Sequence, residues 1–113
     1  MAKRVLWFSR HQMSDEQKDA LGKGIEIHQI SATIAHASEL STEIAEADVV
    51  AIVAPIGLQQ EFLRAAGDKP VIMAVSAREI IPGENGEEDK VNFRFVKWER
   101  LVKIDVVKED YIP

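Results

Sequence analysis

The chain has 113 residues, of which 46% are apolar and 29% charged, with a net charge of −5 and no cysteine. These values are typical of one globular domain with its own hydrophobic core, and they exclude disulfides, thiolate nucleophiles and cysteine-ligated metals. The acidic balance argues against binding to duplex nucleic acid, although two or three local cations suffice to bind a small anion. The sequence shows no signal peptide and no stretch near the roughly 20 apolar residues of a membrane-spanning helix. We therefore expect a cytoplasmic protein that does not bind membranes.

Strands and helices are predicted to alternate along residues 1–80. Apolar runs typical of buried sheet strands occupy residues 5–8, 49–54 and 71–75, and residues 25–30 are predicted to form a strand of mixed polarity with one face less well covered. Amphipathic patterns predict helices at residues 14–21, 38–47 and 58–66. The first helix begins with a capping box from Ser14 to Gln17, and Ser38 is the predicted cap of the second, which places Leu40, Ile44 and Ala47 at helical spacing.

The C-terminal third departs from this alternation. Residues 82–90 are acidic and rich in turn formers, which predicts an exposed loop after the fourth strand ends at residues 76–78. Residues 91–95 alternate apolar and polar, and residues 101–107 are again strand-like. Two interpretations fit residues 91–108: a hairpin that turns at Glu99-Arg100, or one long bent strand.

These patterns predict a single α/β domain over residues 1–113. Its core would be a small Rossmann-like open sheet of about four parallel strands with helices on both faces, followed by a C-terminal strand or hairpin. The aromatic side chains are expected to cover the sheet rather than to stack on bases. They are Trp7, Phe8, Phe93, Phe95 and Trp98.

The carboxyl ends of parallel strands share one edge of the sheet, where open α/β sheets bind ligands. The polar residues expected at this edge are Ser9, Arg10, His11, Gln29, Ser31, Gln59, Gln60, Ser76 and Arg78. Arginine, hydroxyl and amide donors without a carboxylate cluster suit phosphate. The alternative is that they are polar loop residues in solvent.

The usual nucleotide motifs are absent from the chain. Neither a Gly-x-Gly-x-x-Gly nor a Walker motif follows the first strand. Asp15 and Glu16 begin the next helix and would repel a phosphate there, so a phosphate is expected toward Arg10 and Arg78. The histidines at positions 11, 28 and 36 lack the spacing of a metal site, so we expect no metal and no cofactor.

The opening segment carries a resemblance to a known family. Residues 5–17 are an apolar strand followed by Ser-Arg-His-x-Met-Ser-x-x-Gln. This segment resembles the small Rossmann-like proteins of CRISPR type III systems, which include known and predicted ring nucleases that degrade cyclic oligoadenylates. Histidine phosphatases also end their first strand in Arg-His, but Gln12 stands where they have glycine, and their domain is much longer.

The resemblance to ring nucleases implies a homodimer that binds a small cyclic oligonucleotide across its two-fold axis without a metal. The ligand's own 2′-hydroxyl would attack the adjacent phosphodiester. Arg10 and Arg78 would hold the scissile phosphate, and His11 would act as general acid or base. The residues that would bind phosphate or adenine edges are Ser9, Ser31, Gln59, Gln60 and Ser76.

Three other functions remain open from the sequence. The chain is alternatively a non-catalytic sensor of the same nucleotide, or a protein-interaction module that uses the edge strand within residues 91–107. A remoter option is a phosphohistidine carrier that accepts a phosphoryl group on His11.

Overall fold

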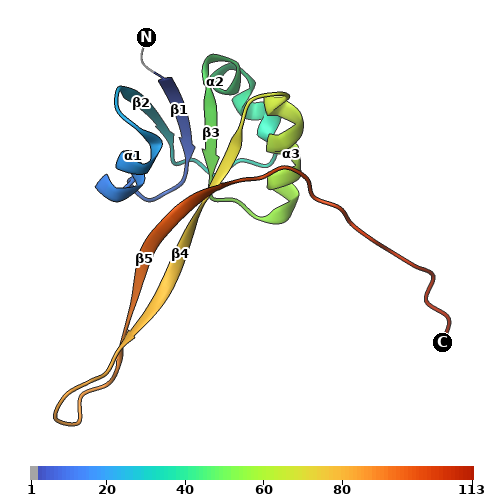
Figure 1. Cartoon of the computed structure of the whole chain (residues 1–113). Coiled ribbons are helices and arrows are strands. Elements are labelled where there is room, and N and C mark those ends of the chain that lie inside the picture. Colours follow the sequence, from blue (N-terminus) through green and yellow to red (C-terminus); the bar gives the residue numbers. More distant parts are fainter. Residues whose placement is uncertain (1–2) are drawn as a thin grey trace.

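The computed structural model describes residues 3–113 and contains one five-stranded sheet with the strand order β2-β1-β3-β4-β5 (Figure 1). The strands are β1 (Lys3–Phe8), β2 (Ile25–Ile30), β3 (Val49–Ile52), β4 (Val71–Ile81) and β5 (Lys90–Arg100). The helices are α1 (Asp15–Leu21), α2 (Ser41–Glu46) and α3 (Ile56–Ala66), and a 3-10 helix, Ala37–Leu40, precedes α2. The first four strands of this order pair in parallel, while β5 pairs antiparallel with β4. The predicted α/β fold class is confirmed.

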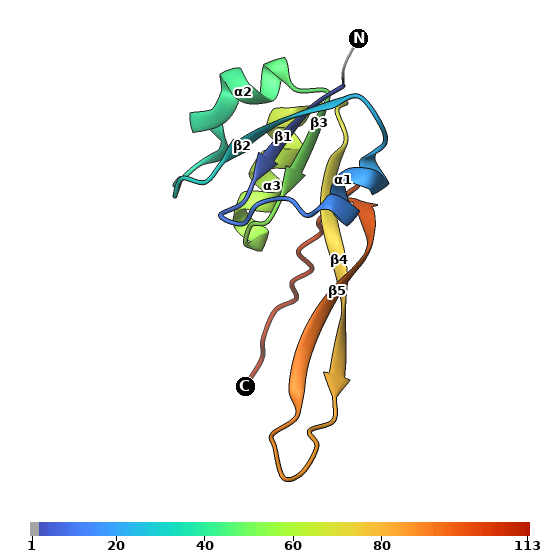
Figure 2. The ribbon, with the colours of Figure 1, turned by 90° about the vertical axis from the view of Figure 1, so that its left-hand side faces the viewer.

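Helices cover the two faces of the sheet (Figure 2). On one face Leu6, Phe8 and Ile52 pack with α2 and α3, and the ring of Phe62 lies 5.3 Å from that of Phe8. The other face carries a smaller cluster next to α1, built around Trp7. The central strands are buried on both faces, which explains why residues 5–8 and 49–52 are continuous apolar runs. Among the described residues no helix has the length and apolarity to cross a membrane.

Of the two helix caps predicted from the sequence, one is confirmed and the other is wrong. The capping box of α1 is confirmed, because Gln17 N–H donates to Ser14 Oγ (3.2 Å) and Ser14 N–H donates to Gln17 Oε1 (2.9 Å). The predicted cap at Ser38 is wrong, since Ser38 lies inside the 3-10 helix. The backbone there is held instead by the carboxylate of Glu39, which accepts from the N–H groups three and four residues earlier.

The bounds of two core elements also differ from the sequence prediction. The strand expected at residues 49–54 ends at Ile52. The following helix begins at Ile56, two residues before its predicted start, with Pro55 at the N-cap position. Proline fits there because the N–H that it lacks has no partner at the start of a helix.

The largest difference from the sequence prediction is a long ribbon of two strands, which we call the arm (residues 73–99). Only Val71 and Ile72 of β4 pair with β3, but β4 continues to Ile81 and pairs with β5 along this whole length. The prediction that β4 ends at residues 76–78 is therefore wrong. The predicted hairpin turn at Glu99-Arg100 is wrong, and the alternative of one long strand is confirmed only up to Arg100, because residues 101–107 form no strand. The partner of β5 in a hairpin is β4.

The arm projects from the carboxyl edge of the sheet, and the C-terminal segment leaves the domain in another direction (Figure 1). The radius of gyration of the Cα atoms is 17.5 Å, against about 13 Å for a compact chain of about 100 residues. At the end of the arm Asn85 and Gly86 both have positive φ (56° and 82°), and Glu87 N–H donates to the Glu84 carbonyl at 3.1 Å. Two adjacent residues of positive φ are what a tight type I′ hairpin turn requires.

Candidate functional site

A cavity of about 380 Å³ lies at the carboxyl ends of β1 and β2. Its wall begins with the last residue of β1 and the turn after it, and continues through the segment after β2 and the start of α3. The lining residues are Phe8, Ser9, Arg10, His11, Ile30, Ser31, Ala32, Thr33, Ile34, Val53, Pro55 and Leu58. Of the residues predicted for this edge, Ser9, Arg10, His11 and Ser31 thus lie around one cavity, and no carboxylate is among its lining residues.

The turn at residues 9–11 is held by its backbone. The His11 carbonyl accepts from the Trp7 indole N–H (2.8 Å) and from Gln29 Nε2 (3.0 Å). Gln29 Nε2 also donates to the Ser9 carbonyl at 3.0 Å, and the buried Ser9 hydroxyl accepts from the His11 N–H at 3.1 Å. These bonds fix the turn, while the side chains of Arg10 and His11 remain exposed. A fixed backbone at this turn holds the Cα positions of Arg10 and His11 in place before a ligand arrives.

Arg10 is oriented across the cavity by a residue that the sequence prediction missed. Arg10 Nη2 donates to Thr33 Oγ1 at 2.7 Å, which joins the turn after β1 to the segment after β2. This bond engages one of the five guanidinium N–H groups, and the others are suited to phosphate oxygens. Thr33 lay in a stretch rich in alanine, serine and threonine, so only its position three residues after a strand end pointed to it.

Four predicted site residues do not line this cavity. Gln59 Nε2 donates to the Ala54 carbonyl at 2.7 Å and thereby supports the start of α3. Gln60 lies in the same helix. Ser76 and Arg78 lie on the arm, because β4 continues through them instead of ending there. Ser76 and Arg78 lie on the arm because β5 provides hydrogen-bond partners that extend β4 beyond its pairing with β3.

The other two histidines have separate environments. His28 is an exposed residue of β2, and His36 Nδ1 lies 3.1 Å from Glu61 Oε1, which also accepts from the Ala37 N–H. Within residues 3–113 no group of three histidine or carboxylate side chains is placed to hold a metal ion.

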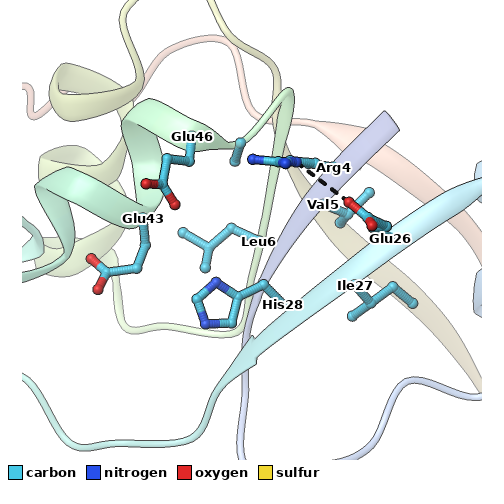
Figure 3. Close-up of a pocket in the computed structure, with 9 residues that line it drawn as sticks. Arg4, Val5, Leu6, Glu26, Ile27, His28, Glu43 and Glu46 are labelled. Carbon is cyan, nitrogen blue, oxygen red and sulfur yellow. Dashed lines mark ion pairs between the residues drawn. The ribbon is translucent and has the colours of Figure 1, made fainter. Parts of the chain in front are cut away.

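A second cavity of about 380 Å³ lies between β2 and α2 and is acidic (Figure 3). Glu43 and Glu46 extend from α2 toward it, with His28 facing them from β2. Glu26 at its rim pairs with Arg4 at 3.4 Å. Three carboxylates against one arginine would repel an anion. The two cavities therefore differ in charge: the one at the strand ends has Arg10 and no carboxylate among its lining residues, whereas this one has three carboxylates and one arginine.

The chain matches no protein-family model, no curated protein and no solved structure.

Proposed function

We propose that this chain is a small Rossmann-like ring nuclease that binds a cyclic oligoadenylate at the carboxyl edge of its sheet and cleaves it without a metal. One observation carries the proposal: Arg10 and His11 stand exposed, on a turn held by hydrogen bonds, at the wall of a cavity whose lining includes no carboxylate. A phosphodiester is an anion, and a guanidinium beside hydroxyl groups is the donor set that suits it.

The strand order supports placing a nucleotide here. In the parallel part of the sheet the order is β2-β1-β3-β4, so the chain reverses its direction of growth between β1 and β3. Ligands of open α/β sheets bind outside the carboxyl ends of the strands at such a reversal. Ser9 follows β1 at this point, and Val53 and Pro55, which follow β3, also line the cavity. Their apolar side chains offer a surface for an adenine ring.

The proposed reaction is an internal transesterification. The 2′-oxygen of one nucleotide attacks the adjacent phosphorus, a 2′-O–P bond forms and the P–O5′ bond breaks. His11 accepts the 2′-hydroxyl proton, and a proton is returned to the leaving 5′-oxygen, so the products are a linear strand with a 2′,3′-cyclic phosphate and a 5′-hydroxyl. Imidazole suits this role because its ordinary pKa of about 6.5 lies near neutrality. Arg10 would stabilise the negative charge that develops on the phosphoryl oxygens.

The other residues near the proposed site have different roles. Ser9 uses its hydroxyl to accept from the His11 N–H, so its proposed contribution is to position His11. Ser31 and Thr33 line the cavity and supply hydroxyl donors to the ligand. Arg78 lies on the arm and has no part in the mechanism proposed for Arg10 and His11.

The test is cleavage of cyclic tetra-adenylate and hexa-adenylate by the purified protein in EDTA, with the linear products separated by chromatography. We expect His11→Ala to lower the cleavage rate about 100-fold or more, which is the usual contribution of general acid–base catalysis. Arg10→Ala should lower it as well, because a transition-state charge loses its partner.

Matched controls come from the acidic cavity. His28→Ala and Arg4→Ala remove the same side-chain types from exposed positions of β2 and β1, and both variants should cleave at the wild-type rate. A folded wild-type protein that leaves both rings intact contradicts the catalytic proposal. Thermal stabilisation by the uncut ring would then assign the cavity to a nucleotide sensor, because a ligand that binds only the folded state raises its stability.

A further inference from the structure

The turn at residues 9–11 is held by two side chains on the other face of the sheet from the cavity at the strand ends. Trp7 of β1 and Gln29 of β2 are partners in the parallel register of these strands, so their side chains share a face. This face is next to α1, because Trp7 belongs to the cluster there. The cavity is lined by Phe8 and Ile30, which follow Trp7 and Gln29 by one residue and therefore lie on the opposite face.

The N–H donors of Trp7 and Gln29 meet at one backbone oxygen. The His11 carbonyl accepts from the Trp7 indole N–H at 2.8 Å and from Gln29 Nε2 at 3.0 Å. A carbonyl oxygen has two lone pairs, so both are occupied. Gln29 Nε2 also donates to the Ser9 carbonyl at 3.0 Å, which uses the second N–H of the same amide group. Gln29 therefore binds the backbone on both sides of Arg10.

These bonds change the role expected of Gln29. The sequence predicts it at the carboxyl edge among donors suited to phosphate, but both N–H groups of its amide bind the turn, and it is not among the residues that line the cavity. Its effect on a ligand therefore passes through the turn. Arg10 and His11 do line the cavity, and a displacement of about 1 Å in a site of this kind lowers a reaction rate by up to about 100-fold.

Trp7 and Gln29 differ in what else holds them. Trp7 is buried in the core, and the ring of Trp98 packs edge-on against it with 5.8 Å between ring centroids. The Trp98 indole N–H donates to the Gln17 carbonyl of α1 at 3.0 Å, which joins the tryptophan pair to the helix after the turn. Gln29 is half-buried on an edge strand of the sheet. A substitution at Gln29 thus removes hydrogen bonds to the turn with little change in the core.

We propose that Gln29 is a positioning residue of the site. Together with Trp7 it holds the backbone at Ser9 and His11, so that the side chains of Arg10 and His11 start at fixed points on the wall of the cavity. It does not itself contact the ligand. The inference rests on the proposed function, because it assigns Arg10 and His11 to a reacting phosphodiester, but its first test needs no nucleotide.

The first test is amide hydrogen exchange in the turn. Gln29→Met keeps the length of the side chain and removes both N–H donors. Exchange at the His11 N–H, which donates to Ser9 Oγ, should accelerate about tenfold as the turn loosens. The matched control is His28→Met, which changes the neighbouring exposed residue of β2 on the opposite face and should leave this exchange at the wild-type rate. Wild-type exchange at His11 in Gln29→Met overturns the proposal.

Gln29→Glu tests whether donation from this position holds the turn. The charged carboxylate has the shape of the amide but only accepts hydrogen bonds, so it repels the two carbonyl oxygens. A protonated carboxyl group regains one O–H donor. Compared with wild type at the same pH, exchange at His11 should therefore be faster at neutral pH and return toward the wild-type rate as the pH falls through the ordinary glutamate pKa of about 4.3. A ratio of rates that does not change with pH contradicts the proposal.

The second test is cleavage of cyclic tetra-adenylate and hexa-adenylate in EDTA. Gln29→Met should lower kcat/KM about 10- to 100-fold. In the His11→Ala background the same substitution should cost no more than about threefold, because a residue that acts through another loses its effect when the other is removed. Faster exchange without slower cleavage, or an equal loss in both backgrounds, overturns the positioning role. If wild type cleaves neither ring, the proposed reaction fails, and the exchange rates still decide whether Gln29 holds the turn.

Discussion

Phe62 and Phe93 show how differently the two parts of this molecule use the same side chain. Phe62 in α3 is 0% exposed and packs against Phe8 in the core. Phe93 on the arm lies mostly in solvent. The core satisfies its apolar groups within one chain, whereas the arm presents them outward on a rigid ribbon. The difference indicates that buried aromatic side chains stabilise the core, whereas Phe93 contributes little burial to the fold.

The largest expected effect is a difference in unfolding free energy between alanine variants of these two phenylalanines. Phe62→Ala should lower the free energy of unfolding by about 3–5 kcal/mol, because it removes a buried ring and leaves a cavity. Phe93→Ala should change the unfolding free energy by no more than about 0.5 kcal/mol, as is usual for an exposed residue. Urea denaturation measures both. Equal losses for the two variants would show that the arm belongs to the folding core.

A smaller effect is expected from the turn at the tip of the arm. Gly86→Val places a β-branched residue at a φ of 82°, which should cost roughly 1–2 kcal/mol of local stability. Amide hydrogen exchange should then accelerate about tenfold in residues 76–81 and 90–95 and remain unchanged in β1 and β3.

Gly57→Val is the matched control, because Gly57 lies in α3 and its φ is not in the left-handed region. It should leave exchange in the arm at the wild-type rate. Equal acceleration in the arm and in β1 after Gly86→Val would mean that the arm and the core unfold together.

The sequence was informative where a local pattern decides the structure. The continuous apolar residues 5–8 and 49–52 are buried on both faces of the sheet, and the capping box at Ser14 begins α1. The ends of adjacent parallel strands lie side by side, and for this reason one cavity brings together Ser9, Arg10, His11 and Ser31. No side-chain contact had to be known for these predictions.

The arm could not be predicted from apolar alternation alone. Alternation at Val91, Phe93 and Phe95 shows which side chains share a face, but not which strand is the partner. The polar residues Ser76 and Arg78 suggested a strand end, although pairing with β5 carries β4 through them. One signal was present: Asn85-Gly86 is a strong hairpin turn, and it indicated that residues 82–89 join two paired strands. Recognising it would have moved Ser76 and Arg78 away from the predicted site.

The smallest expected effect is the loss, at low pH, of the hydrogen bonds that hold the segment after β2, which carries Thr33. The Glu39 carboxylate accepts from the N–H groups of His36 and Ala35, and these bonds hold the pKa of Glu39 below its ordinary value. A lowered pKa means that the charged form stabilises the folded state. This contribution is complete above the ordinary glutamate pKa of about 4.3 and is lost as the pH falls from there through the lowered value. Thr33 lies two residues before this anchor.

Glu39→Gln removes the charge and keeps a side-chain acceptor. At neutral pH we expect faster amide exchange at Ala35 and His36 in this variant than in wild type, with exchange in the arm unchanged. The difference between the two proteins should disappear as the pH falls through the lowered pKa, because wild-type Glu39 is then neutral as well. If the difference in exchange rate between variant and wild type stays constant below that pKa, the charge of Glu39 does not hold the segment. Loss of arm protection in the same variant would couple the core to the arm, since the anchor lies in the helical layer under α3 and makes its bonds only within residues 35–39.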